Sequence, residues 1–133
     1  MRILLDTNAY SSLMRGTRDL ILQVHRSKRV FLSTIVLGEL LYGFFHGSRR
    51  EDNLRRLNEF LQDRRVTVVP VSFTTSELFG RISAGLRRKG SLIPTNDIWI
   101  AAHAMETESS LLSYDPHFER RGSGLASPRL GLL

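Results

Sequence analysis

The chain has 133 residues, the usual length of one domain, and we expect a single domain over residues 1–133. Cysteine is absent, which excludes disulfide bonds, a thiolate nucleophile and a sulfur-based zinc site, while 41% hydrophobic and 24% charged residues are typical of a folded globular protein. The net charge of +6 at pH 7 favours a polyanionic partner such as RNA or DNA, although each arginine pair could equally be a solvated helix surface.

The first predicted element is a buried strand over residues 3–5, which ends at the turn-forming residues 6–8. This apolar run is far shorter than a signal peptide or a membrane span, so we expect a cytoplasmic protein with no membrane association. A helix over residues 19–27 and a second strand over residues 30–32 follow.

The next predicted element is a helix over residues 34–45 that is apolar nearly all round, a pattern that indicates burial on more than one side. After it, Ser48 and Glu51 have the spacing of a capping box and predict the start of a helix with a stripe of leucines.

A third strand is expected over residues 66–71 because β-branched side chains are frequent there. Thr74 and Glu77 predict a second capping box, and Gly90 should end that helix. Thr95 is the expected N-cap of the last helix.

Residues 111–112 predict a fourth strand that ends at Asp115, and residues 122–133 are weakly patterned. Strands that alternate with helices, with connections too long for hairpins, indicate an α/β domain with a mainly parallel sheet. Ligands of such sheets bind beyond the carboxyl ends of the strands.

Four acidic residues stand out from the others, and Glu39 is the most informative. Its neighbours three and four positions away are Ile35, Val36, Tyr42 and Gly43, so its own helix offers it no cation. A buried carboxylate needs a cation, a proton or water from elsewhere. The alternative is a glutamate on a narrow solvated edge of the helix.

The other three acids are Asp6 and Asp115 at strand ends and Asp97 in the first turn of a helix. Each could simply be a turn or helix-start residue. Together with Glu39, however, they form the layout of a shared acidic pocket. Because all the donors are oxygen, the fitting ion is Mg²⁺ or Mn²⁺, and a basic protein with such a pocket suits phosphodiester hydrolysis.

Four segments resemble, in order and spacing, the acidic motifs of PIN domains. They are LLDTN (4–8), STIVLGEL (33–40), NDIWIAAHA (96–104) and SYDPHF (113–118). The match spans nearly the whole chain, and its short length resembles the VapC toxins of toxin-antitoxin pairs. The resemblance implies a PIN-like three-layer sandwich, with a mainly parallel central sheet flanked by helices, that forms one nuclease domain.

The resemblance also implies a Mg²⁺- or Mn²⁺-dependent endoribonuclease. Its catalytic and metal-binding residues would be Asp6, Glu39, Asp97 and Asp115, with Asp6 and Asp97 as the most direct ligands. A metal-bound water would attack the phosphorus and leave a 5′-phosphate and a 3′-hydroxyl.

Three polar side chains next to these acids could orient them or could be turn and cap residues: Thr7, Asn8 and Ser113. Ser113 stands where the family often has threonine. The histidines show no paired spacing on one helix face and are interpreted as surface or core residues, and Trp99 is interpreted as a core residue rather than a stacking platform.

The partners implied by the resemblance are a structured cellular RNA such as tRNA or rRNA, a VapB-like antitoxin and a second copy of the chain. The apolar helix over residues 35–45 is compatible with such contacts but could equally be the central core helix. Other readings are a PIN nuclease of RNA processing without an antitoxin and a non-catalytic nucleic-acid-binding module. An aspartate-based phosphotransfer enzyme is disfavoured because no second aspartate stands two residues after Asp6.

Overall fold

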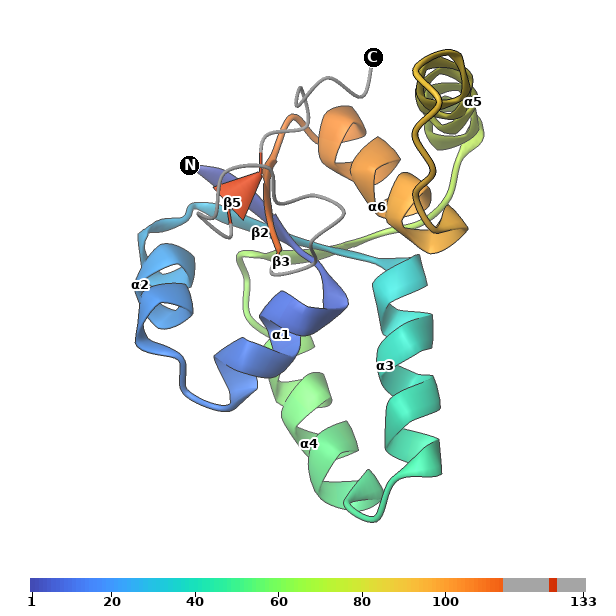
Figure 1. Cartoon of the computed structure of the whole chain (residues 1–133). Coiled ribbons are helices and arrows are strands. Elements are labelled where there is room, and N and C mark those ends of the chain that lie inside the picture. The colour runs from blue at the N-terminus through green and yellow to red at the C-terminus, as the bar shows by residue number, and fades with distance from the viewer. Residues whose placement is uncertain (114–124, 127–133) are drawn as a thin grey trace.

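One sheet runs through the molecule and is built from five strands: β1 (Arg2–Leu5), β2 (Arg29–Ser33), β3 (Val66–Val69), β4 (Ser110–Leu112) and β5 (Leu125–Ala126). The computed structural model describes residues 1–113 and 125–126 of the chain. The strand order is β3-β2-β1-β4-β5, and the first four strands are parallel while β5 pairs antiparallel to β4 (Figure 1). The predicted mainly parallel sheet is therefore confirmed.

Two helices lie in each connection between parallel strands. They are α1 (Thr7–Met14) and α2 (Arg18–Arg26), α3 (Thr34–His46) and α4 (Arg50–Leu61), and α5 (Phe73–Arg88) and α6 (Thr95–Glu106). In Figure 1 the sheet separates α1 and α2 from α5 and α6, while α3 and α4 extend away from it as a pair. This arrangement, a mainly parallel sheet between layers of helices, is the sandwich that the resemblance implied. No helix in the described part of the chain combines the length and apolarity needed to cross a membrane.

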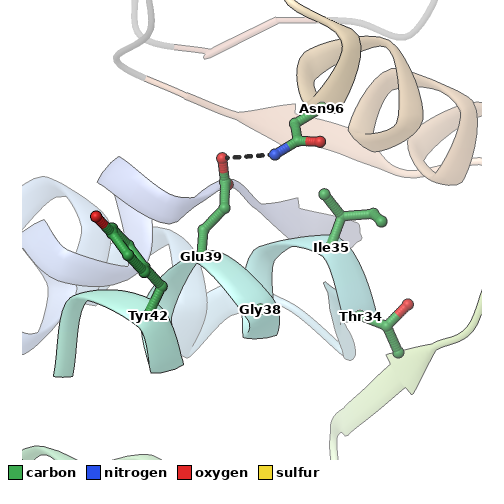
Figure 2. A pocket seen from close by; sticks show the side chains of 6 residues that line it. All are labelled: Thr34, Ile35, Gly38, Glu39, Tyr42 and Asn96. Atoms are coloured by element: carbon green, nitrogen blue, oxygen red, sulfur yellow. Dashed lines mark hydrogen bonds between the residues drawn. The ribbon is translucent and has the colours of Figure 1, made fainter. Parts of the chain in front are cut away.

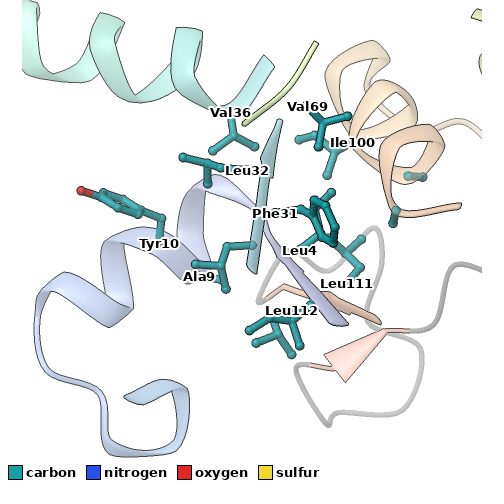
Figure 3. Close-up of a cluster of buried hydrophobic side chains, with 14 of the residues drawn as sticks. Leu4, Ala9, Tyr10, Phe31, Leu32, Val36, Val69, Ile100, Leu111 and Leu112 are labelled. Carbon is teal, nitrogen blue, oxygen red and sulfur yellow. The ribbon is translucent and has the colours of Figure 1, made fainter. Parts of the chain in front are cut away.

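The core lies on both faces of the central strand β1. Ile3, Leu4 and Leu5 have no exposed surface, as expected for a parallel strand covered by helices on each side. Figure 3 shows Leu4 beside Phe31 and Leu111, which come from the two strands that pair with β1. These contacts fix the register of the strands, and with it the places where they end.

The chain enters a helix immediately after β1, where the sequence predicted only a turn. Asp6 is the N-cap of α1, and its carboxylate accepts a hydrogen bond from the Ala9 amide at 2.7 Å. An aspartate that begins a turn and one that caps a helix have the same local pattern. The turn assignment at residues 6–8 was therefore wrong at Thr7 and Asn8, which are helical.

The predicted helix starts were also displaced. Arg49, not Ser48, is the N-cap of α4, and no side chain caps it. The capping box of α5 is formed by Ser72 and Thr75, two residues before the predicted Thr74. Pro94, not Thr95, is the N-cap of α6, so the three predicted caps were wrong by one or two residues although each helix exists.

The apolar helix α3 is less buried than its composition predicted. Only Val36 and Leu40 are fully buried, while Tyr42 is 71% and Phe45 is 53% exposed. The reason is its position, because α3 packs on the sheet only near its start and then extends outward with α4 (Figure 1). An apolar surface near Glu39 is therefore open to solvent.

Candidate active site

The order in which the chain adds strands reverses between β1 and β4. The strands β2 and β3 are added on one side of β1, and β4 is added on the other side. Such a switch point is where open α/β sheets bind ligands, beyond the carboxyl ends of the strands. Asp6 and Ser113 directly follow these two strands. The Ser113 hydroxyl donates a hydrogen bond to Oδ2 of Asp6, and the Asp6 amide donates to the Leu112 carbonyl at 3.1 Å. Both side chains are almost fully buried.

Glu39 is held between two other elements at the same edge. The Thr7 hydroxyl, at the start of α1, donates to Oε1 of Glu39. The Asn96 amide, at the start of α6, donates to Oε2 at 3.3 Å (Figure 2). Thr7 directly follows Asp6, and Asn96 directly precedes Asp97. One carboxylate thus connects the segments that carry the other two acids.

Asp97 lies in the first turn of α6, as predicted, and is 8% exposed. A carboxylate at this position is favoured by the positive end of the helix dipole. Since its neighbour Asn96 contacts Glu39, Asp97 and Glu39 belong to the same region of the molecule and not to opposite sides of it.

The fourth predicted acid, Asp115, lies outside the described residues. In the part of the chain that the structure describes, no group of three or more acidic or histidine side chains is arranged to hold a metal ion. The donors that are present fit a hard ion in their chemistry, because Asp6, Glu39 and Asp97 offer only carboxylate oxygens. Neighbouring hydroxyl and amide groups already orient two of these three carboxylates.

The roles predicted for the flanking polar residues are partly seen in the contacts. Thr7 and Ser113 donate to Glu39 and Asp6, whereas Asn8 is exposed and, within the described residues, makes no hydrogen bond to an acid. Asn96 was not singled out from the sequence. The only signal was its position before Asp97, because its contact with Glu39 joins residues 57 positions apart.

A pocket of about 580 Å³ opens beside Glu39. It is lined by Thr34, Ile35, Gly38, Glu39 and Tyr42 from α3 and by Asn96 from α6 (Figure 2). Polar groups and an exposed aromatic ring therefore lie next to the carboxylate.

A buried histidine connects the helices that carry these side chains. Nε2 of His103, on α6, donates to the Pro70 carbonyl at 3.1 Å, and Nδ1 accepts from the hydroxyl of Ser33 at 2.8 Å. The same hydroxyl caps α3 by accepting from the Ile35 amide. Burial lowers the pKa of His103, so the ring is neutral at pH 7, consistent with both hydrogen bonds. His103 is thus a core residue, as the sequence predicted.

Trp99 stacks against Phe79 with the ring centroids 4.0 Å apart. This contact joins α5 and α6, but Trp99 is half-buried and lies outside the hydrophobic core, where the sequence had placed it. Of the four histidines, His117 lies outside the described residues.

Comparison with known proteins identifies the family. The model of the PIN domain matches residues 3–123, which is most of the chain. The chain is 31% identical over 123 residues to ribonuclease VapC2 of Haemophilus influenzae, and this match covers 90% of the chain and 92% of that protein. It is also 31% identical over 88 residues to ribonuclease VapC2 of Rickettsia felis, where the match covers 66% of the chain but less than two thirds of the relative, 64%.

Solved structures agree with this assignment. The chain resembles a chain of VapBC2 from Rickettsia felis, determined bound to a DNA fragment from the promoter, with a TM-score of 0.78 and 27% identity over 90% of this chain and 92% of that one. It also resembles VapBC-1 from nontypeable Haemophilus influenzae, with a TM-score of 0.75 and 28% identity over 86% and 87% of the two chains. The chain belongs to the PIN domain family and is most similar in these comparisons to VapC ribonucleases.

Proposed function

We propose that the chain is a Mg²⁺- or Mn²⁺-dependent endoribonuclease and the toxin of a toxin-antitoxin pair. The observation that carries this proposal is the position of Glu39, whose carboxylate is fixed between the residues adjacent to Asp6 and Asp97. The names of the relatives supply the substrate class, RNA, and the solved VapBC-5 from Mycobacterium tuberculosis, described as a member of the VapBC family of toxin-antitoxin systems, supplies the partner.

The residues that would hold the metal are Asp6, Glu39, Asp97 and Asp115. A divalent ion held by these carboxylates would lower the pKa of a bound water and neutralise charge on a scissile phosphate. The protein residues keep the acids oriented: Ser113 holds Asp6 and Thr7 holds Glu39. The net charge of +6 attracts the RNA backbone.

The test is cleavage of total cellular RNA in Mn²⁺ or Mg²⁺ by the parent chain and by Asp97→Asn. Loss of one ligand should reduce cleavage roughly 100-fold or more. Glu77→Gln is the matched control, since this acid is exposed on α5 and should be dispensable. Equal cleavage by the parent and Asp97→Asn would show that the site is wrong.

The toxin assignment has its own test. Expression of the chain should arrest growth, and co-expression of the adjacent small reading frame should restore it. Growth arrest that no neighbouring frame relieves would favour a PIN nuclease of RNA processing instead. An intact, folded chain that binds RNA but cuts none in either metal would favour the non-catalytic binding module.

We infer that the chain associates with a second copy, as the resemblance implied. Phe73 and Leu92 support this inference, because they are 85% and 93% exposed and large apolar side chains are frequent in homodimer contacts. Sedimentation equilibrium at micromolar concentration should give a dimer mass for the parent chain. A monomer at every concentration would contradict it.

A further inference from the structure

The pocket beside Glu39 contains an exposed aromatic residue, Tyr42, that has no role in the proposed metal site. Tyr42 lines the pocket and is 71% exposed, whereas tyrosine is on average intermediate between the buried and the exposed residue types. The Tyr42 ring is nearly parallel to that of His46, with an interplanar angle of 8° and 5.9 Å between the centroids. His46 is not among the described residues that line the pocket, so it supports the tyrosine from outside it.

We propose that this pocket is a subsite for one unpaired nucleobase of an RNA strand, with the Tyr42 ring as the stacking surface. The proposal rests on the proposed ribonuclease function, because it places the base next to the acids that would cleave the strand. Proteins that recognise single-stranded RNA commonly stack bases on exposed aromatic rings.

Two polar side chains, Glu39 and Asn96, also line the pocket, as recognition of a base edge requires (Figure 2). Asn96 has both a donor and an acceptor on its amide, and the Glu39 carboxylate has more lone pairs than its two hydrogen bonds use. A base edge carries N–H groups that such acceptors can bind. A phosphate carries none and would be repelled by the Glu39 carboxylate, so the base is the favoured occupant.

The floor of the pocket is open because position 38 is glycine. A Cβ added at Gly38 meets nothing within 4 Å, and Figure 2 shows the residue on α3 between Ile35 and Glu39. A larger side chain there would enter the pocket without a clash against the protein backbone. Gly43, on the same helix, is equally open but does not line the pocket, and it is therefore a matched position for a control.

Arginines lie beyond the end of the same helix, at the start of α4. Glu39 and His46 are seven residues apart, or about 10 Å of helix rise. Beyond His46, Arg49 and Arg50 line a second hollow at the turn between α3 and α4, which Glu51 and Asp52 also line. Arg50 covers the Phe45 ring at 5.4 Å from its centroid, which leaves Tyr42 as the more accessible aromatic ring. Sites for single strands combine stacking rings with basic side chains along the path of the backbone. Arg49 and Arg50 would meet a strand that runs from Tyr42 toward the turn between α3 and α4.

The experiment measures binding of short single-stranded RNAs that carry 2-aminopurine at successive positions, in EDTA so that no metal-dependent cleavage occurs. Stacking on an aromatic ring quenches the fluorescence of this base. Parent protein should quench one position strongly. Tyr42→Leu should abolish the quenching and weaken binding roughly 10-fold, while Tyr42→Phe retains both.

Two controls separate the pocket from general effects. Gly38→Leu should weaken binding like Tyr42→Leu, whereas Gly43→Leu and Phe45→Leu should bind like the parent. Equal loss in Phe45→Leu, or undiminished quenching in Tyr42→Leu or Gly38→Leu, would overturn the proposal. Circular dichroism of each variant confirms that α3 is retained.

Failure of the base subsite can be distinguished from failure of the proposed ribonuclease function. Loss of quenching in Tyr42→Leu, together with failure of Asp97→Asn to reduce cleavage, would leave the base subsite standing and remove the assigned acids. If Tyr42→Leu weakens binding of the antitoxin but changes neither quenching nor RNA affinity, the surface serves a protein partner and the proposal is wrong.

Discussion

The hydroxyl of Ser33 lies 2.8 Å from Nδ1 of His103 and simultaneously caps the helix that carries Glu39. Since His103 lies six residues after Asp97 on α6, this contact joins the two helices on which those acids are placed. Protonation of Nδ1 would turn this nitrogen from the acceptor of the Ser33 hydrogen bond into a donor. The geometry at this edge therefore depends on a neutral histidine.

Acid should destabilise the protein through His103. Burial lowers its folded-state pKa below the usual 6.5, so the unfolded chain binds the proton more readily. The contribution of the neutral His103 to the free energy of unfolding is complete above pH 6.5 and decreases as the pH falls below that value. Urea unfolding at pH 7.5 and pH 5 should show this loss in the parent chain. The loss should be smaller in His103→Gln, whereas His25→Gln, at an exposed position, should behave like the parent; identical pH dependence in all three proteins would contradict the assignment.

The hydroxyl of Thr7 should act by positioning Glu39. Thr7→Val keeps the shape of the side chain but removes the donor, and RNA cleavage should fall roughly 10-fold or more. Thr7→Ser keeps the hydroxyl and should remain close to the parent. If the role is positioning, Thr7→Val should also need more Mn²⁺ for half-maximal activity. A loss of stability without any change in the Mn²⁺ titration would point to a purely structural role.

Gly90 should be sensitive to substitution because of its backbone conformation. Its φ is +70°, and it follows the C-cap Lys89 of α5. Gly90→Ala should cost about 1 kcal/mol of unfolding free energy. Gly80→Ala, in the middle of the same helix with open space around it, should instead stabilise by about 0.5–1 kcal/mol. Thermal unfolding of the two variants should therefore shift in opposite directions.

The observed capping box of α5 can be separated from the predicted one by mutation. Ser72→Ala removes the side chain that accepts from the Thr75 amide and should cost about 1 kcal/mol. Thr74→Ala should change stability by less than about 0.5 kcal/mol, since this exposed residue does not cap the helix. A larger loss of stability in Thr74→Ala than in Ser72→Ala, measured by urea unfolding, would support the capping box predicted from the sequence.

The strands were predictable because their residues carry the signal themselves. The apolar run at residues 3–5 forms a buried strand, and the β-branched residues from Val66 onward form a strand that is only partly buried. Helix starts were less predictable. A serine or threonine three residues before a polar residue occurs at several nearby positions, and tertiary packing chooses among them.

The candidate site was predictable only in part. Its acids stand in recognisable motifs, but Asn96 contacts Glu39 across 57 residues, and such a contact leaves no local trace. The exposure of Tyr42 could not be predicted either, because it also depends on tertiary structure. Composition describes α3 as buried, whereas its burial depends on how far it extends beyond the sheet.

The central position of β1 has a consequence for biosynthesis. Its first neighbour, β2, leaves the ribosome early, but the strand on its other side, β4, is translated more than a hundred residues after β1 begins. Until then the Asp6 carboxylate lacks the Ser113 hydroxyl and one flank of its strand. A nascent chain thus completes this edge of the sheet only after residue 113 has left the ribosome.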